Sequence, residues 1–261
     1  MADKCRELQK KFDYRLDTDK YVLVHVDGRS FSSRIKKRFK RPFDDDFIDM
    51  MNRTAVYLCE NTQGARIAYV QSDEISMLLR KTNPKGDIFF SGRLCKMQSI
   101  IASMATAIFN SLMVSYRILK QSESAGGIAN NPALYNFDCK VWTVDNVNDV
   151  MAWFLFRNID CVRNSKEQLA QTYYSHRQLM NITCDEQIEV LKNEKGIDWH
   201  EFPEGQKYGR LIYPEERIYT RDDIKGDVSD EDTVYVRRKW VVHDGMDLTN
   251  PENRERLSRI I

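Results

Sequence analysis

Two segments decide the fold: residues 21–31, YVLVHVDGRSF, and residues 66–80, RIAYVQSDEISMLLR. The first begins with a β-branched apolar run, which predicts a strand that ends at Asp27 and Gly28. The second has two apolar runs separated by SDE at 72–74, which predicts two strands joined by a very tight turn. Each acidic interruption could be an ordinary turn, so the question is whether together they form one site.

The surrounding patterns extend this to the order β-α-β-β-α-β. Acidic residues at 44–46 favour the start of a helix that runs to about residue 61, and apolar residues at helical spacing predict a long helix from residue 92. Alternation at 137–144 predicts a fourth strand. This order is typical of the split βαβ, ferredoxin-like fold, so we expect an α+β protein. Ser30 could also cap a short helix at 34–37.

The pattern changes after residue 144. We expect helices at 150–176 and 184–195, strands at 205–219 and 233–242 that can pair as a hairpin around an acidic loop, and a short helix in the tail. We therefore divide the chain into a catalytic core, residues 1–144, and a helical and hairpin C-terminal part, residues 145–261, packed on the core.

Composition narrows the class of protein. The 261 residues are 42% apolar, and 40 Lys and Arg nearly balance 39 Asp and Glu, so any basic surface must be local. No run of about 18 apolar residues occurs and the N-terminus is polar, so we expect no membrane span and a cytoplasmic location. Scattered cysteines without a C-x-x-C pair make a zinc site or a disulfide framework improbable.

Asp27 and Asp73 are the candidate metal ligands. In the expected sheet the first strand lies beside the hairpin, so both carboxylates fall at the same edge. Two Mg²⁺ ions need few protein oxygens, and such a metal pair can activate an attacking oxygen and stabilise a leaving pyrophosphate. Gly28 would allow a triphosphate to approach the backbone. On spacing alone, a metal site and two unrelated turns remain equally acceptable interpretations.

Two basic features could serve such a site. Arg93, Lys96, Ser99 and Ser103 share one arc of the long helix, opposite its apolar stripe, and would suit phosphates if they face the carboxylates. A solvated polar face is an equally good explanation. The run KKRFKR at 36–41 could contact a nucleic-acid backbone, although such runs are usually ordinary surface.

Six motifs together resemble one family. HVDGRSF, FKRPFD, QSDEIS, GRLCKMQSIIAS, FDCKV and FRNIDCVRNS occur in the order and spacing of tRNA-His guanylyltransferases and their guanylyltransferase-like relatives, over roughly residues 15–215. The resemblance implies a palm domain like that of template-dependent polymerases, working in the 3′-to-5′ direction. A nucleotide would be added to the 5′ end of a tRNA after activation of that end by ATP or GTP. It also implies a homotetramer.

The resemblance also implies roles for individual residues. Asp27, Asp73 and Glu74 would be catalytic, and the Asp27 and Asp73 carboxylates with the Gly28 carbonyl would bind two Mg²⁺ ions. The nucleotides would be bound by Asp27, Gly28, Arg29, Ser30, Phe31, Ser32, Arg41, Ser72, Asp73, Arg93, Lys96, Ser99, Arg157, Asp160 and Asn164.

One stretch departs from the pattern of strict tRNA-His enzymes. Those carry His-x-Asn-Asn where this chain has Val-Arg-Asn-Ser at 162–165, and Phe156 replaces their Trp. The stretch is similar to the guanylyltransferase-like branch, which repairs 5′-truncated tRNAs by templated addition without being tied to one tRNA. We therefore expect template-dependent 3′-to-5′ addition to tRNA. The first alternative is a strict tRNA-His guanylyltransferase that adds G at position −1.

Two further alternatives belong to other classes. A palm-type nucleotide cyclase would usually read Gly-Gly-Asp/Glu-Glu-Phe in the hairpin, where this chain has QSDEI at 71–75. A non-catalytic RNA-binding ferredoxin-like module would need exposed aromatic residues on its central strands, and these are mainly aliphatic apart from Tyr69.

Overall fold

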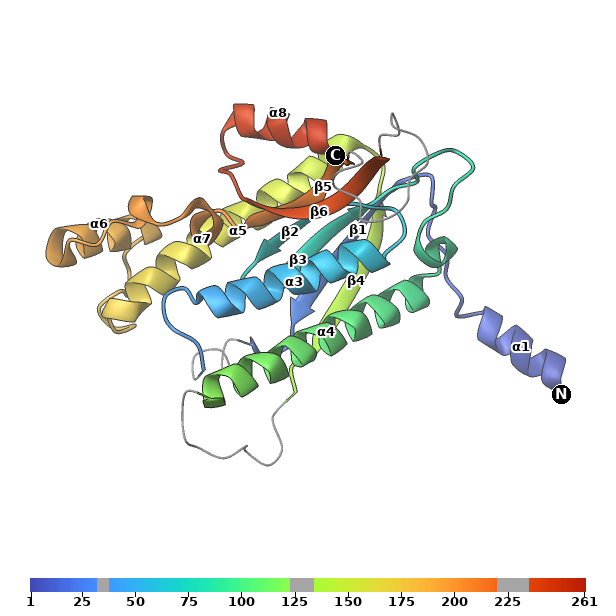
Figure 1. The fold of residues 1–261 in the computed structure, drawn as a ribbon, viewed down its shortest axis with the longest axis horizontal. Coiled ribbons are helices and arrows are strands. Elements are labelled where there is room, and N and C mark those ends of the chain that lie inside the picture. Colours follow the sequence, from blue (N-terminus) through green and yellow to red (C-terminus); the bar gives the residue numbers. More distant parts are fainter. Residues whose placement is uncertain (32–37, 123–133, 220–234) are drawn as a thin grey trace.

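The computed structural model describes residues 1–31, 38–122, 134–219 and 235–261. Its centre is an antiparallel sheet of six strands in the order β4-β1-β3-β2-β5-β6 (Figure 1). The strands are β1 Tyr21–Gly28, β2 Ala65–Gln71, β3 Glu74–Leu79, β4 Phe137–Val144, β5 Arg210–Tyr219 and β6 Tyr235–Asp244.

Helices cover both faces of the sheet. On one face lie α3 (Asp45–Asn61) and α4 (Leu94–Ser122), and on the other lie α5 (Val147–Tyr173) and α8 (Pro251–Ile260). The other helices among the described residues are α1 Ala2–Lys10, α6 Cys184–Lys195 and α7 Glu204–Lys207, with short 3₁₀ turns at Phe89–Gly92 and Trp199–Glu201. The protein is therefore a layered α+β fold with a palm-like βαββαβ core.

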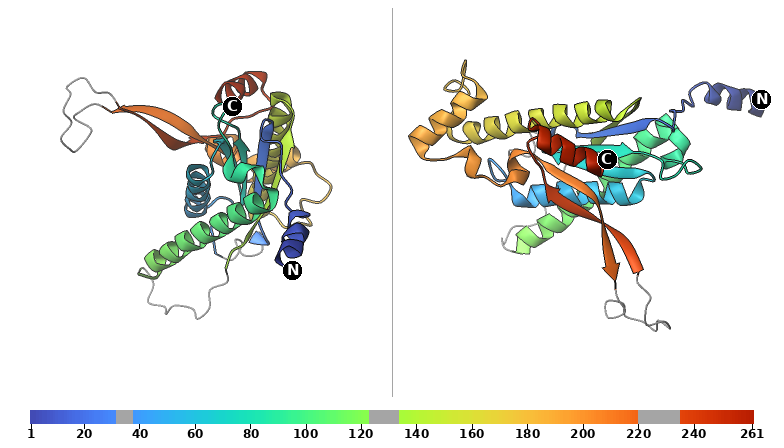
Figure 2. Two further views of the ribbon diagram at one scale, coloured as in Figure 1. Left: turned by 90° about the vertical axis from the view of Figure 1, so that its right-hand side faces the viewer. Right: turned by 90° about the horizontal axis from the view of Figure 1, so that it is seen from above.

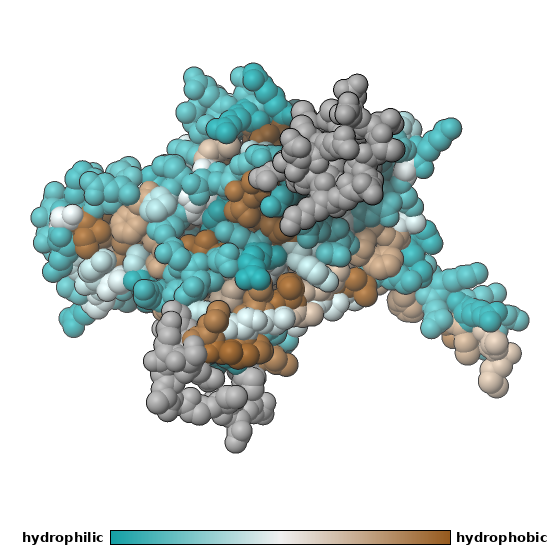
Figure 3. Space-filling model, viewed as in Figure 1, coloured by the Kyte–Doolittle hydropathy of each residue, from teal (hydrophilic) through white to brown (hydrophobic). Residues whose placement is uncertain are grey.

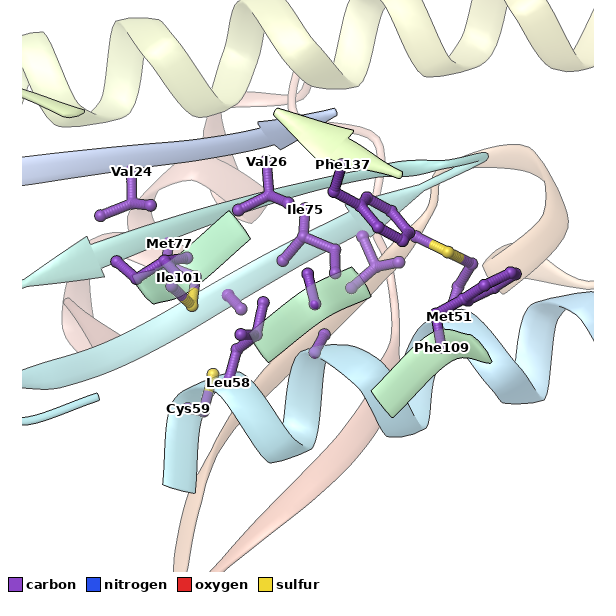
Figure 4. Close-up of a cluster of buried hydrophobic side chains, with 14 of the residues drawn as sticks. Val24, Val26, Met51, Leu58, Cys59, Ile75, Met77, Ile101, Phe109 and Phe137 are labelled. Carbon is purple, nitrogen blue, oxygen red and sulfur yellow. The ribbon is translucent and has the colours of Figure 1, made fainter. Parts of the chain in front are cut away.

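Side chains alternate between the two faces of the sheet along β1. The strand therefore contributes to both hydrophobic cores, and the alternation determines on which face Asp27 lies. Val22, Val24 and Val26 are fully buried against α3 and α4 (Figure 4), whereas Leu23 is buried in the cluster on the α5 side. Fully burying one such side chain stabilises the fold by about 1.5–3 kcal/mol. Because side chains alternate along a strand, Asp27 follows Leu23 on the α5 side.

Most expected elements are confirmed. The four strands and two helices of the βαββαβ core are present, and so are the later helices and the hairpin. The strand expected from residue 205 is wrong at its start: residues 204–207 form α7 after Pro203, and Gly209, with φ of 78°, turns the chain into β5. No element was expected at α1. The helix proposed at 34–37 and the acidic loop lie outside the described residues.

The division at residue 144 stays a prediction. β5 pairs with β2, so the C-terminal strands continue the sheet of the core.

Three parts of the molecule have surfaces that the other described residues do not cover. α1 projects and has no buried residue, and the β5–β6 arm extends away from the body (Figure 2). Leu94–Leu119 of α4 is long and apolar enough to cross a membrane by length and composition alone, but the same holds for core helices, and a third of its most apolar window is buried. Its outer side leaves Val114, Ile118 and Leu119 exposed. Figure 3 shows brown, hydrophobic surface over the C-terminal half of this helix.

Candidate active site

The structure brings Asp27 and Asp73 together. In the β1–β3 ladder Asp27 lies opposite Glu74, and the Gly28 N–H donates to the Asp73 carbonyl over 3.1 Å. A Cβ placed on Gly28 would lie 2.8 Å from Asp73 Oδ2. Only glycine therefore leaves room for this approach, and the two acidic interruptions of the sequence occupy one place.

The hairpin turn holds Asp73 in position. Ser72 has a φ of 44°, in the left-handed region that favours glycine, and its hydroxyl donates to Asp73 Oδ1 over 3.0 Å. A non-glycine residue in this region costs of order 1–3 kcal/mol, and such strain is concentrated at functional sites. The turn thus accepts a strained backbone while it presents a carboxylate.

The carboxylates carry an excess of negative charge. Burial raises the pKa of Asp73 to about 7; the Ser72 hydroxyl opposes this shift, and the charges of Asp27 and Glu74 add to it. Burial also raises the pKa of Asp27, and the nearby Glu74 and Asp138 raise it further. A divalent cation bound here would relieve the repulsion that these shifts express.

The donor atoms fit magnesium. The site offers two carboxylates and the Gly28 backbone carbonyl, which are hard oxygen ligands. No three Asp, Glu, His or Cys side chains within the described ranges gather into a metal-binding group. Mg²⁺ characteristically takes one or two carboxylates and completes its shell with water and substrate phosphates, so a small protein donor set is what this ion requires.

Glu74 is tied to α5. The Arg157 guanidinium donates to Glu74 Oε2, and the Gln71 amide donates to the same oxygen over 2.8 Å. Arg157 also lies 3.2 Å from Asp160, which accepts from Arg163. Two of the predicted binding residues, Arg157 and Asp160, thus form a network that locks α5 onto the strand that carries Glu74. The catalytic role of Glu74 stays a prediction.

A cavity of about 280 Å³ lies beside Asp73. Its walls come from the loop at 40–43, the first turn of α3, the hairpin and one side of α5. Four predicted residues line it: Arg41, Ser72, Asp73 and Asn164. Sequence reasoning missed Gln168, Gln171, Gln206 and Arg210, which also line it. The helical spacing of Asn164, Gln168 and Gln171 was the available signal for a shared face.

Asp44 shapes the wall of the cavity. Its Oδ1 accepts from the Phe47 N–H over 2.9 Å and caps α3, while its Oδ2 accepts from the Lys40 N–H over 2.8 Å. The loop that carries Arg41 is therefore folded back onto the helix by one buried carboxylate.

Arg93, Lys96 and Ser99 are not brought to the carboxylates. Arg93 donates to Asp13 over 2.9 Å, and Gly92 packs against Leu16 and Thr18, which precede β1. β1 has eight residues, so its two ends are roughly 20 Å apart. The expectation that this arc faces the metal site is wrong within one chain. That these side chains bind nucleotide stays a prediction.

The segment after β1 is only partly available to a ligand. Arg29 is exposed, and its N–H donates to the Asn136 carbonyl over 2.9 Å; Ser30 has a φ of 58°. The Phe31 ring is buried against Phe109 and Phe137, so the ring itself is not available to a ligand, and only the backbone of this residue could line a nucleotide; that it does so stays a prediction. Aromatic residues from α4 and β4 pack around the Phe31 ring and make it part of the core. Ser32 lies outside the described residues.

Comparison with known proteins identifies the family. The family model described as tRNAHis guanylyltransferase matches residues 2–145, more than half of the chain. The chain belongs to this family. A tRNA(His) guanylyltransferase of Neurospora crassa is 27% identical over 229 residues, 82% of this chain and 73% of that protein. An uncharacterized protein of Acanthamoeba polyphaga mimivirus is 26% identical over 241 residues, 87% of this chain and 81% of that protein.

Solved structures of the family have the same fold. A bacterial tRNA(His) guanylyltransferase-like protein in complex with ATP has a TM-score of 0.80 at 27% identity, covering 100% of this chain and 98% of that one. A bacterial guanylyltransferase-like protein in complex with GTP has a TM-score of 0.74 at 26% identity, covering 99% and 97%. This guanylyltransferase-family chain is therefore a nucleotidyltransferase, which excludes the non-catalytic RNA-binding alternative.

Proposed function

We propose that this guanylyltransferase-family enzyme adds nucleotides in the 3′-to-5′ direction to the 5′ end of truncated tRNAs, with base choice set by the opposite strand. The observation that carries the proposal is the stretch at 162–165. The Ser165 hydroxyl accepts from the Trp199 indole over 3.1 Å and Val162 packs against the same cluster. These two side chains serve the fold, which leaves selection of the incoming base to Watson–Crick pairing with the RNA.

The proposed chemistry follows from the edge of the sheet that carries Asp27 and Asp73, which we call the carboxylate edge. Two Mg²⁺ ions, when bound, would supply charge stabilisation for the attacking and leaving oxygens. Asp27 and Asp73 would hold them, and Gly28 keeps the backbone clear for phosphates. Arg41 and Lys40 at the cavity wall would neutralise triphosphate charge, and the cavity would hold the base of the activating nucleotide.

Several partners are part of the proposal. We infer ATP or GTP as activating nucleotides, nucleoside triphosphates as the units added, and the acceptor end of tRNA as the acceptor. A homotetramer would cover surfaces that one chain leaves open, such as α1 and the outer side of α4. A cytoplasmic location and the absence of a membrane span complete the proposal.

The test uses truncated tRNAs of several identities that differ at the base opposite the missing nucleotide. With Mg²⁺, ATP and each nucleoside triphosphate in turn, the complementary nucleotide should be added in every case, because a mismatch leaves polar groups unpaired. Addition of G to tRNA-His alone, whatever base lies opposite, would establish the strict guanylyltransferase instead. Cyclisation of a triphosphate without RNA would establish the cyclase.

A further inference from the structure

Three amide side chains form a ladder along one side of α5. Asn164, Gln168 and Gln171 follow one another at steps of four and three residues, so they share one helix face, and all three line the cavity beside Asp73. None of the three side chains has a hydrogen-bond partner among the residues that the structure describes. Three free amides on one face supply donors and acceptors that the fold itself does not use.

Several other polar groups of the cavity wall are already used by the fold. Gln206 donates to Asp45 over 3.3 Å, and the Gln71 amide nitrogen donates to Glu74. Both carboxylate oxygens of Asp44 accept backbone N–H groups. The amides of α5 therefore remain as neutral groups that can both donate to and accept from a polar ligand edge.

Two buried atoms give independent evidence for a polar occupant. Gln71 is 2% exposed and Arg210 is 6% exposed, and both line the cavity. Gln71 Oε1 and Arg210 Nη2 have no hydrogen-bond partner within the described part of the chain. Buried polar groups are rarely left unpaired, so an acceptor and a donor in the same wall indicate a ligand or water that carries both.

The opposite wall suits a flat ring. Pro42, Phe43, Phe47 and Ile48 supply apolar and aromatic surface from the loop and the first turn of α3. A nucleobase held against this surface by its faces presents its edge to α5.

Adenine and guanine differ in a way that one amide can accommodate. At its 6-position and N1, adenine presents a donor and then an acceptor, whereas guanine presents an acceptor and then a donor. A carboxamide offers one acceptor and one donor side by side, and a half-turn of its terminal group exchanges them. The same side chain therefore satisfies either purine.

We propose that Gln168 recognises the purine edge of the activating triphosphate and accepts both adenine and guanine by flipping its amide; this rests on the proposed function. Gln168 is half-buried in the middle of the ladder, whereas Gln171 is exposed at the rim. Arg157 contacts Glu74 at the carboxylate edge, and Gln168 lies about 16 Å further along the helix axis. Asn164 lies about 6 Å closer to the phosphates along that axis.

The deciding variant is Gln168→Glu. A carboxylate only accepts, and guanine offers it two adjacent donors, N1–H and the 2-amino group, where adenine offers one. Binding of ATP, GTP and inosine triphosphate with Mg²⁺ is measured directly, beside single-turnover activation of a 5′-monophosphorylated tRNA. We expect the GTP-to-ATP ratio in both measurements to rise about tenfold or more relative to the unmodified enzyme. Inosine triphosphate lacks the 2-amino group, so its ratio to ATP in the two measurements should not rise in this way.

Matched variants separate recognition from general damage. Gln168→Leu should weaken ATP and GTP equally, Gln171→Glu should shift the ratio less than Gln168→Glu, and Gln9→Glu on α1 should leave it unchanged. If the unmodified enzyme binds both nucleotides and Gln168→Glu is folded with an unchanged ratio, the recognition proposal is overturned while the proposed function stands. If the unmodified enzyme neither binds nor uses either nucleotide, the proposed function is overturned together with it.

Discussion

The two ends of β1 treat charge in opposite ways. Where the strand ends, Asp27 and Asp73 crowd together and their pKa values are raised. Where it begins, exposed or half-exposed charges are paired, at distances of 2.6–2.9 Å: Lys20 with Asp145, Lys81 with Asp19, and Arg93 with Asp13.

The contrast separates structural from functional charge. Exposed pairs are satisfied within the chain, and each contributes little to stability because solvent screens the charges. Carboxylates that crowd together at a partly buried edge cost stability, and a fold that retains them keeps a place for a cation. Substitutions at the two ends should therefore fail in different assays.

The largest effect is expected at the crowded end. Asp27→Ala and Asp73→Ala should each lower nucleotide addition more than about a hundredfold, several kcal/mol of lost transition-state stabilisation. Single-turnover addition to a truncated tRNA measures this loss. Asp145→Ala, which removes one partner at the paired end, should retain full activity. Near-normal nucleotide addition by a folded Asp27→Ala or Asp73→Ala variant would contradict the assignment of these residues as ligands of two metal ions.

Gly28→Ala should come next. The added Cβ would lie 2.6 Å from the Phe31 ring and 2.8 Å from Asp73 Oδ2, so the core or the carboxylate must move. We expect roughly a ten- to hundredfold loss of activity and about 1–3 kcal/mol of lost stability. Gly196→Ala after α6 is the control: its φ of 70° makes Ala unfavourable, but activity should persist. Equal activity of the two variants would contradict the tight fit at Gly28.

Asp73→Asn should uncouple stability from activity. The folded pKa of about 7 lies above the ordinary value of 3.8, so the carboxylate costs little stability below pH 3.8, progressively more between pH 3.8 and 7, and a constant amount above pH 7. Without Mg²⁺ the Asn variant should therefore be more stable than the parent at pH 8, on the order of 1–2 kcal/mol after allowance for solvent screening at the turn. Denaturant unfolding at pH 8 and pH 4 measures this difference, which should vanish at the lower pH. A less stable variant at pH 8 would show that the crowding is absent.

The smallest effect is expected at the paired end. Lys81→Ala removes a partner of the 82%-exposed Asp19, so the free energy of unfolding should fall only slightly, with nucleotide addition unchanged. Thermal unfolding at low and high salt measures the pair, since salt screens exposed charges. A loss of stability as large as that of the Gly28→Ala variant would show that Lys81 does more than pair with an exposed carboxylate.

The sequence predicted the elements whose information is local. Alternation over residues 21–26 and the tight turn at 72–73 were sufficient to place Asp27 beside Asp73. Arg93 was misplaced because its distance from Asp27 depends on where α4 starts relative to the sheet, which the packing of Gly92 on Leu16 determines. Burial of the Phe31 ring could not be predicted because the aromatic residues that bury it come from other segments, such as Phe109 and Phe137.

The cavity could not be predicted because it forms between distant segments. Its walls join residues near 40, 72, 165 and 206, and no short pattern connects them. The strand expected at residues 205–209 is absent for a local reason: Pro203 and Glu204 favour the start of a helix.

The turn between β2 and β3 contains only Ser72 and Asp73, so it also restricts changes in the length of this hairpin. Side chains alternate along β2 and β3, so one residue inserted or deleted here would move Glu74 to the α3 side or withdraw Asp73 from Gly28. Insertions and deletions in this hairpin should therefore disrupt the site, even where the inserted residue is small and polar. The length of the projecting β5–β6 hairpin is restricted only by the pairing of its two strands. We therefore expect differences in hairpin length among related enzymes to occur in that arm.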